Sequence, residues 1–154
     1  MNQKFFAQAA LAISFSALTI VSCTKKEEAN QSGAVVGDKI KIGHYAALTG
    51  QTATFGQSTK KGVDLAQEQF NAGGGLNGKL VDVITYDDQS KTEEVSAVVT
   101  KLITQDNVLA LLGEVASSLS LVAADKAMQF KTPMLSPSST NPDVTKKGEY
   151  VSRI

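Results

Sequence analysis

The sequence has one cysteine, one histidine and no excess of charge of either sign. A single cysteine has no partner within the chain, so the fold cannot depend on an internal disulfide. The one histidine is far from that cysteine in the sequence, which argues against a metal site built from these two residue types. Basic and acidic residues number 15 each, without a long run of either sign, which argues against a nucleic-acid partner.

The rest of the composition is that of an ordinary globular domain. Of the 154 residues, 42% are hydrophobic and 19% are charged, and a chain of this length can bury a substantial core. We find no internal repeat and no low-complexity block. The composition therefore gives no sign of a fibrous or disordered protein.

The first 22 residues differ from the rest and predict a lipoprotein signal peptide. Lys4 precedes a mostly apolar stretch, and the small residue Ser22 precedes the only cysteine, Cys23; this order is typical of secretory signals. Polar residues interrupt the apolar stretch, which disfavours a transmembrane helix of roughly 20 apolar residues. The letters LTIVSC resemble the bacterial lipoprotein signal, which implies lipidation of Cys23 and anchoring to a membrane. A soluble secreted form and an uncleaved anchor are the alternatives.

Residues 23–38 are polar and aperiodic, and we predict that they form a flexible tether. A flexible coil of this length spans roughly 20 Å, enough to hold a folded body above a bilayer. The folded body itself is expected to comprise residues 39–154.

From Lys39 onward, strand-like and helix-like patterns alternate. The predicted strands are 39–48, 79–88, 108–113 and 132–137, with a fifth beginning at 150–154. The predicted helices are 59–72, a segment that begins at Ser90 and continues through Ile103, and 119–130. This alternation implies right-handed βαβ units. The expected fold class is α/β, with a Rossmann-like parallel sheet and helices on both of its faces.

The helix expected after Ser90 has the strongest signal. Its apolar face is formed by Val95, Val98, Val99, Leu102 and Ile103. This spacing is that of an amphipathic helix. Ser90 and Glu93 have the spacing of a capping box, which predicts the start of the helix. The strand expected at 108–113 is apolar on both faces, as strands between two helical layers are.

Two clusters of hydroxyl side chains follow predicted strands. Ser117 and Ser118 follow the third strand and precede a helix. The second cluster lies at the carboxyl end of the fourth strand and consists of Ser136, Ser138, Ser139 and Thr140. Ligands of parallel sheets bind outside the carboxyl ends of the strands, and the free amides at the start of a helix attract anions. We therefore expect a site for a small anionic group. The alternatives are a simple helix cap at Ser117 and ordinary hydroxyl turns.

Two further patterns have other interpretations. Residues 73–78, GGGLNG, match G-x-G-x-x-G, but they follow a helix and open a strand, the reverse of the dinucleotide-binding order. We expect a helix stop and a tight turn there. Asp87 and Asp88 end the second strand and suggest either a cation or ammonium site or solvated acids at a strand end, the latter being favoured.

The residues also argue against an enzyme. Ser117 lacks the G-x-S-x-G context of a hydrolase nucleophile, and His44 is the only histidine that could activate it. A lone histidine in a strand is expected to be packed or hydrogen bonded. We expect neither catalysis nor a cofactor.

Residues 39–154 resemble the leucine/isoleucine/valine-binding proteins, the type I periplasmic receptors of branched-chain amino acid ABC transporters. The most specific similarities are NAGGGLNGKL, YDD, the serine loop after the third strand, and SPSSTNP. The resemblance implies two α/β lobes that close on a ligand, with residues 39–154 forming part of the N-terminal lobe. It also implies that the sequence is truncated and that the second lobe is absent from it.

The resemblance further implies which residues bind the ligand. The serine loop, here Ser117 and the amide of Ser118, would hold the α-carboxylate. The turn after the fourth strand would contribute the Ser138 carbonyl and the Thr140 amide and hydroxyl. Phe55 occupies the position of an aromatic that lines the pocket in that family, although it is equally compatible with an ordinary packed aromatic.

The function implied is that of an extracytoplasmic solute-binding lipoprotein. Such a protein captures amino acids, in this family typically branched-chain ones, by their carboxylate and ammonium and delivers them to an ABC permease. Its expected location is periplasmic or at the cell surface, lipid-anchored to a bacterial membrane. The alternative is a ligand-sensing receptor domain of the same fold for an amide, urea or aromatic acid.

Overall fold

The computed structural model describes residues 39–154. The predicted signal peptide, the tether and Cys23 lie outside these residues. The strands are β1 (Ile40–Ala46), β2 (Val81–Asp87), β3 (Ala110–Leu112), β4 (Met134–Ser136) and β5 (Val151–Arg153). The helices are α1 (Ala53–Ala72), α2 (Thr92–Thr104), α3 (Ser117–Phe130) and α4 (Asp143–Lys146). None of the helices in the described part of the chain combines the length and the apolar character that crossing a bilayer requires.

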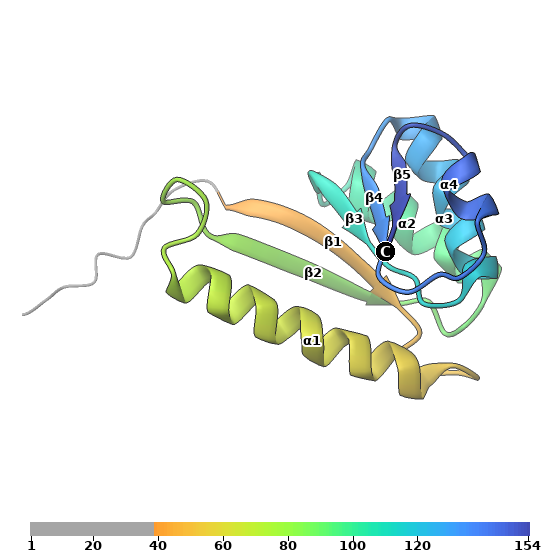
Figure 1. Ribbon diagram of the computed structural model, residues 1–154, viewed down its shortest axis with the longest axis horizontal. Helices are drawn as coiled ribbons and strands as arrows, with labels where there is room; N and C mark the ends of the chain where they lie inside the picture. The colour runs from red at the N-terminus through yellow and green to blue at the C-terminus, as the bar shows by residue number, and fades with distance from the viewer. Residues whose placement is uncertain (1–38) are drawn as a thin grey trace, which may run out of the picture. The chain divides into compact units, whose positions relative to one another are not determined.

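The five strands form one parallel sheet in the order β2-β1-β3-β4-β5 (Figure 1). β1 pairs with β2 along its whole length and pairs with β3 on its other side. The chain therefore leaves β1 in one direction, to β2, and then returns to the opposite side of β1, to β3. Ligands of open parallel sheets bind at such a reversal of the strand order, outside the carboxyl ends of the strands.

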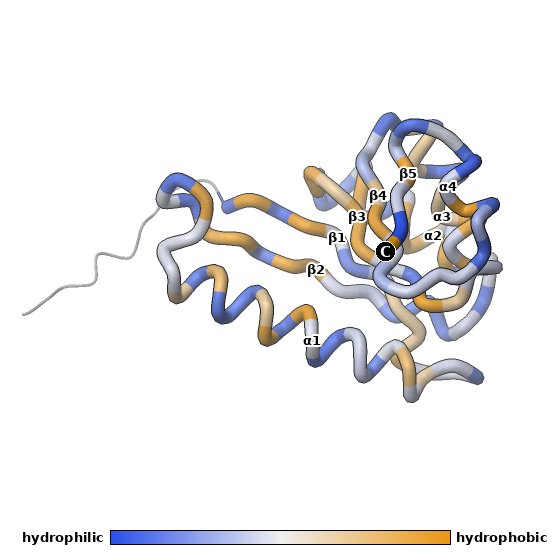
Figure 2. Tube along the Cα trace, in the orientation of Figure 1, coloured by the Kyte–Doolittle hydropathy of each residue, from blue (hydrophilic) through white to orange (hydrophobic). Residues whose placement is uncertain are grey.

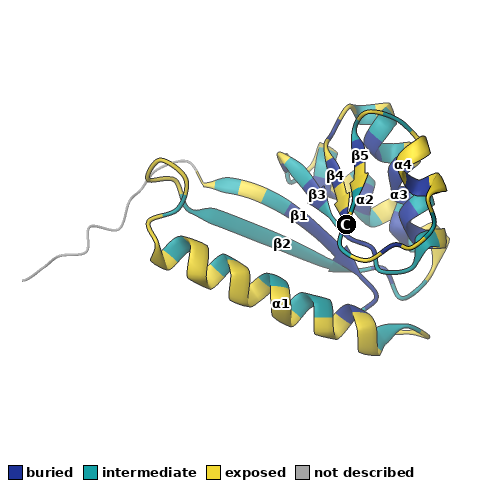
Figure 3. Ribbon diagram, viewed as in Figure 1, coloured by how far each residue is buried: buried dark blue, intermediate teal, exposed yellow. Residues whose placement is uncertain are grey.

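Helices lie on both faces of this sheet, as predicted. Helix α1 runs along β1 and β2 on one face, and α2 and α3 pack together on the other (Figure 1). The buried residues between the sheet and α2 and α3 are Tyr45, Val95, Val99, Leu102, Val108, Leu111, Leu119, Ala123, Ala124, Ala127, Met134, Val144 and Val151. In contrast, α1 exposes residues along its outer side and buries only Gly56 (Figure 3). The main core of the described residues therefore lies on the α2 and α3 face.

Helix α1 begins at Ala53, six residues earlier than predicted. The apolar spacing indicated only the later turns, because the first turns consist of small polar residues that are also typical of loops. In the structure, the hydroxyls of Ser58 and Thr59 donate to carbonyls four residues earlier, at Thr54 and Phe55. These hydrogen bonds are compatible with a helix and use polar groups that the composition associates with turns.

The predicted capping box of α2 is wrong. The helix starts at Thr92 after Lys91, which has an extended backbone, and no side chain caps it. Ser90 instead has a φ of 59°, and its hydroxyl contacts the backbone nitrogen and the hydroxyl of Thr52. The apolar face of the helix is confirmed, because Val95, Val99 and Leu102 are fully buried.

Two other boundaries differ from the prediction. β3 is shorter than expected and only partly enclosed: Leu111 is buried, whereas Leu109, just before the strand, is 67% exposed. The four-residue helix α4 has too few residues to show a helical period and was not predicted. The helix stop and tight turn at residues 73–78 are confirmed, since Gly73 is the C-cap of α1 and a bridge joins Leu76 to Lys79.

A pair of glycines on α1 tests how closely this helix must approach the loop after β1. A Cβ at Gly56 would lie 2.0 Å from the Ala47 carbonyl oxygen, whereas a Cβ at Gly62 would meet nothing within 4 Å. Gly56→Ala should therefore lower the free energy of unfolding by about 1 to 3 kcal/mol or more. Gly62→Ala should raise it by up to about 1 kcal/mol through helix propensity.

Urea denaturation of both variants and the parent protein measures this difference. Equal stability of the two variants would contradict the close approach of α1 to Ala47.

Candidate functional site

The candidate site lies at the carboxyl edge of the sheet, where β1, β3 and β4 end. Three loops start there, at residues 47–52, 113–116 and 137–142. β2 becomes more hydrophilic toward this edge (Figure 2). The edge thus collects polar groups from segments that are far apart in the sequence.

Ser117 joins the two hydroxyl clusters. It is the first residue of α3, and its hydroxyl oxygen accepts a hydrogen bond of 3.2 Å from the backbone N–H of Asn141. Asn141 belongs to the turn after β4 that also contains Ser138 and Thr140. The predicted convergence of the serine loop and this turn is therefore present in the structure.

The helix-cap alternative for Ser117 is wrong. The N-cap position of α3 is Ala116, and no side chain makes a capping hydrogen bond there. The first amides of a helix have no acceptor within the helix itself, so the N–H groups of Ser117 and Ser118 have no intrahelical partner. The Ser117 hydroxyl uses its oxygen to accept from Asn141, which leaves its proton free to be donated.

Burial separates the hydroxyls at this edge into two groups. Ser118, Ser138 and Thr140 are exposed, and Ser117 is half-buried. Ser120, Ser136 and Ser139 are buried and hydrogen bonded to one another and to the Glu114 carbonyl. The accessible group can meet a ligand, whereas the buried group holds the loops together.

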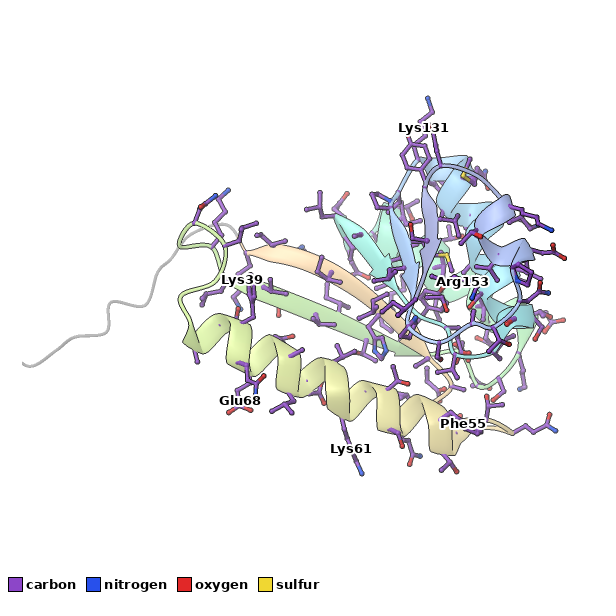
Figure 4. All side chains as sticks on the ribbon, viewed as in Figure 1. Lys39, Phe55, Lys61, Glu68, Lys131 and Arg153 are labelled. Atoms are coloured by element: carbon purple, nitrogen blue, oxygen red, sulfur yellow. The ribbon has the colours of Figure 1, made fainter. Side chains whose placement is uncertain are left out.

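Phe55 lies on the first turn of α1, not in a loop as expected. Its side chain is 62% exposed, so within residues 39–154 it is not an ordinary packed aromatic. Figure 4 shows Phe55 at the end of α1 nearest the carboxyl ends of the strands, opposite the end where Lys39 precedes β1. The structure brings Phe55 to the same edge as the serines without a direct hydrogen bond or packing contact between them among those we describe.

The two aspartates at the carboxyl end of β2 are not simply solvated acids. Asp87 accepts hydrogen bonds from the N–H groups of Leu48 and Thr49 and from the Thr49 hydroxyl. Burial by itself raises the pKa of Asp87, but the hydrogen bonds to the ionised carboxylate outweigh it and keep this pKa below its ordinary value. Asp88 is fully buried, and the prediction of a solvated acid is wrong for it. Its backbone N–H donates to the Ala46 carbonyl, which extends the ladder between β2 and β1 by one residue.

His44 is buried and hydrogen bonded, as predicted. Its Nδ1 lies 3.2 Å from the Thr85 hydroxyl, and burial, assisted by the charge of Lys60, lowers its pKa to about 4. The Ser117 hydroxyl contacts a backbone N–H and not a base, so the arrangement lacks the pairing that activates a nucleophile. Among residues 39–154, no three His, Cys, Asp or Glu side chains are grouped to hold a metal.

Two residues at this edge were missed in the sequence. Glu114 is 1% exposed and its side chain accepts hydrogen bonds from two loops. Arg153, labelled in Figure 4, donates to the Ser139 carbonyl at 3.2 Å. The sequence contained one signal for Glu114: it is a charged residue shortly after a predicted buried strand. Ligands of parallel sheets bind outside the carboxyl ends of the strands, so a charged residue there is a candidate site residue.

The sequence profile of the family described as periplasmic binding protein matches residues 39–152. The chain is also 33% identical, over 117 residues, to the leucine-, isoleucine-, valine-, threonine- and alanine-binding protein of Pseudomonas aeruginosa. That alignment covers 76% of this chain and 31% of the relative. The chain spans 29% to 37% of the length of the first curated relatives that it matches.

Solved structures with a similar fold are also substrate-binding or solute-binding proteins of transporters. A branched-chain amino acid transporter substrate-binding protein from Streptococcus pneumoniae, in complex with isoleucine, superposes with a TM-score of 0.73 at 35% identity. The match covers 75% of this chain and 33% of that one. A solute-binding protein of an ABC transporter from Rhodopseudomonas palustris, in complex with 3,4-dihydroxybenzoic acid, superposes with a TM-score of 0.70 at 26% identity. That match covers 76% of this chain and 32% of the other.

Replacing Asp88 with Asn should remove a pH-dependent loss of stability. Burial, and next the charge of Glu114, raise the pKa of Asp88 to about 7, whereas the unfolded chain loses this proton near pH 4. The stabilising contribution of the bound proton is present below about pH 4 and is lost as the pH rises to about 7. Between about pH 5 and about pH 8, the free energy of unfolding should fall by roughly 1 to 3 kcal/mol more in the wild type than in Asp88→Asn.

The exposed residue Asp125 offers a matched control, because Asp125→Asn should keep the pH dependence of the wild type. Denaturation curves at both pH values measure all three proteins. An unchanged pH dependence in Asp88→Asn would show that Asp88 is not the titrating group.

Proposed function

Because the chain belongs to the periplasmic binding protein family, we propose that residues 39–154 form part of the N-terminal ligand-binding lobe of an extracytoplasmic solute-binding protein of an ABC transporter. The proposed ligands are amino acids, with branched-chain amino acids first among them. One observation carries the proposal: the Ser117 hydroxyl is hydrogen bonded to the backbone of Asn141. This bond places the start of α3 beside the turn that contains Ser138 and Thr140, so one small ligand can contact both.

The chemistry of the two loops suits the two charged groups of an amino acid. The Ser117 hydroxyl and the amide of Ser118 are donors at the positive end of the α3 dipole, which suits a carboxylate. The Ser138 carbonyl and the Thr140 hydroxyl oxygen are acceptors for an ammonium. Three or four charge-assisted hydrogen bonds, each contributing about 1.5 to 3 kcal/mol, approach the 8 kcal/mol or so of micromolar binding before entropy is subtracted.

The remaining parts of the proposal concern the whole protein. A second lobe would close over the ligand and exclude water, which strengthens each polar contact. The closed form would then be recognised by a membrane permease. Lipidation at Cys23, with residues 23–38 as the tether, would keep the receptor at the periplasmic face or at the cell surface of a bacterial membrane.

A second candidate function is a receptor of the same fold for an aromatic acid, an amide or urea, used for sensing. The observation in its favour is the similarity to a solute-binding protein that was solved with 3,4-dihydroxybenzoic acid. An aromatic acid would place its carboxylate on the same donors but has no ammonium for Ser138 and Thr140. Isothermal titration of the intact protein with L-leucine, L-isoleucine and 3,4-dihydroxybenzoate separates the two candidate functions. If the protein binds none of these three ligands, the main proposal is contradicted.

Ser117→Ala should weaken amino acid binding by about 1 to 3 kcal/mol, because a donor to the carboxylate is lost. Calorimetric titration of the intact protein measures this change. Ser58→Ala removes an exposed hydroxyl from α1 and should leave the affinity unchanged. Equal affinities of the wild type and Ser117→Ala would exclude the proposed role of this hydroxyl.

Phe55→Ala should alter the preference among ligand side chains and not the recognition of the carboxylate. The exposed ring offers an apolar surface whose benefit depends on the size of the side chain that it contacts. Relative affinities for L-leucine, L-valine and L-alanine, measured side by side, test this. The same proportional loss for all three amino acids would show that Phe55 does not line the pocket.

A further inference from the structure

The side chain of Glu114 connects two of the three loops that form the candidate site. It is buried in the loop between β3 and α3, next to the point where the strand order reverses. Its Oε1 accepts from the Ala47 N–H at 2.9 Å, and its Oε2 accepts from the Ala116 N–H at 2.6 Å. Ala47 begins the loop that leads to Phe55, and Ala116 is the residue before Ser117. One carboxylate therefore bonds the loop after β1 to the start of α3.

The backbone carbonyl of Glu114 reaches the third loop. The hydroxyl oxygens of Ser120, Ser136 and Ser139 lie 2.9, 2.7 and 3.2 Å from it. A carbonyl oxygen has two lone pairs, so the hydroxyls share it and also bond to one another, with 2.7 Å between Ser136 and Ser139 and between Ser139 and Ser120. Ser139 precedes Thr140, so this network fixes the turn that follows β4.

Arg153 holds the same turn from its other side. It donates to the Ser139 carbonyl, whereas the Ser139 hydroxyl belongs to the network around Glu114. Ser139 is 1% exposed, so its hydroxyl holds the turn from inside and is not accessible to a ligand. The exposed neighbours Ser138 and Thr140 are thereby presented from a turn that is held at the residue between them.

The groups that face Glu114 are acidic or neutral. Asp88 directly follows β2, and its pKa is raised first by burial and then by the charge of Glu114, with Asp87 adding a smaller effect. The Tyr45 hydroxyl, from β1, donates to the Gly113 carbonyl at 2.7 Å. One oxygen of Asp88 accepts from the Ser90 N–H, and the other has no hydrogen-bond partner among residues 39–154. The ionisation of Asp88 therefore places a second buried charge beside the Glu114 carboxylate.

We propose that Glu114 is a positioning residue of the ligand site, which holds the loops after β1, β3 and β4 in their binding arrangement before a ligand arrives. The inference rests on the proposed function, because it concerns the same site, but its geometry is independent of the ligand's identity. Loops that are already ordered lose less conformational entropy on binding, which raises affinity without a new contact to the ligand. A residue that touches no ligand can in this way determine how tightly one is held.

Glu114→Gln tests the proposal with little change in size. However the amide is turned, its NH₂ group faces either the Ala47 N–H or the Ala116 N–H, so one of the two acceptors is lost. Hydrogen exchange at that amide, followed by NMR in the intact protein, should accelerate about tenfold or more. The affinity for whichever of L-leucine, L-isoleucine or 3,4-dihydroxybenzoate the wild type binds should fall about tenfold. Glu68→Gln, on the outer side of α1 (Figure 4), is the matched control and should change neither quantity.

The pH profile of the affinity distinguishes positioning from a general loss of structure. In the wild type, the affinity should decrease as the pH rises through about 7, because ionised Asp88 repels the carboxylate that holds the loops. In Glu114→Gln this inflection should move to lower pH, since one cause of the raised pKa of Asp88 is gone. Unchanged exchange at both amides, or wild-type affinity with an unshifted inflection, would overturn the proposal.

If Glu114→Gln does not fold, Ser139→Ala tests the proposal in its place. It removes only the hydroxyl that bonds the turn to Glu114, so exchange at the Asn141 amide should accelerate and the affinity should fall a few-fold. Wild-type exchange and affinity in this variant would overturn the positioning role. If the wild type binds none of the three ligands, the proposed function fails, while the exchange measurements still decide whether Glu114 holds the loops.

Discussion

The carboxylate of Glu114, bonded to the backbone of Ala47 and Ala116, is the interaction on which the candidate site depends. β1 and β3 are neighbours in the sheet, but β1 leads into α1 on one face and β3 leads into α3 on the other, so the loops that follow the two strands diverge. Hydrogen bonds to a charged acceptor are stronger than those between neutral groups. One buried side chain therefore offsets the tendency of the two loops to separate.

This arrangement has an energetic cost, because it places acidic side chains where water is excluded. Glu114 and Asp88 are both buried, and Asp88 responds with a raised pKa. Buried charges are tolerated when they are hydrogen bonded, and each carboxylate accepts from at least one backbone N–H. The local stability given up in this way is consistent with a site whose geometry serves binding, as the family relationship suggests.

The hydroxyl residues show how burial divides one cluster of similar residues between two roles. Ser136 and Ser139 are buried and satisfy the Glu114 carbonyl, whereas Ser138 and Thr140 are exposed beside them. In the proposed function, the exposed members contact the ligand and the buried members keep them in place.

The order of strands and helices, the parallel sheet and the apolar face of α2 could be predicted from the sequence, because apolar periodicity is a local property and Val95, Val99 and Leu102 follow it. The two hydroxyl clusters were predictable for a related reason, since each directly follows a strand of a parallel sheet. The early start of α1 was not predictable, because its first turns consist of small polar residues that are also typical of loops. The uncapped start of α2 was not predictable either, because the Ser90 hydroxyl contacts Thr52, which is 38 residues away. Only the tertiary structure could decide the role of Glu114: its partners are 67 residues away at Ala47 and 22 residues away at Ser136. Hydrogen bonds between such distant segments exist only after the sheet has brought the strand ends together.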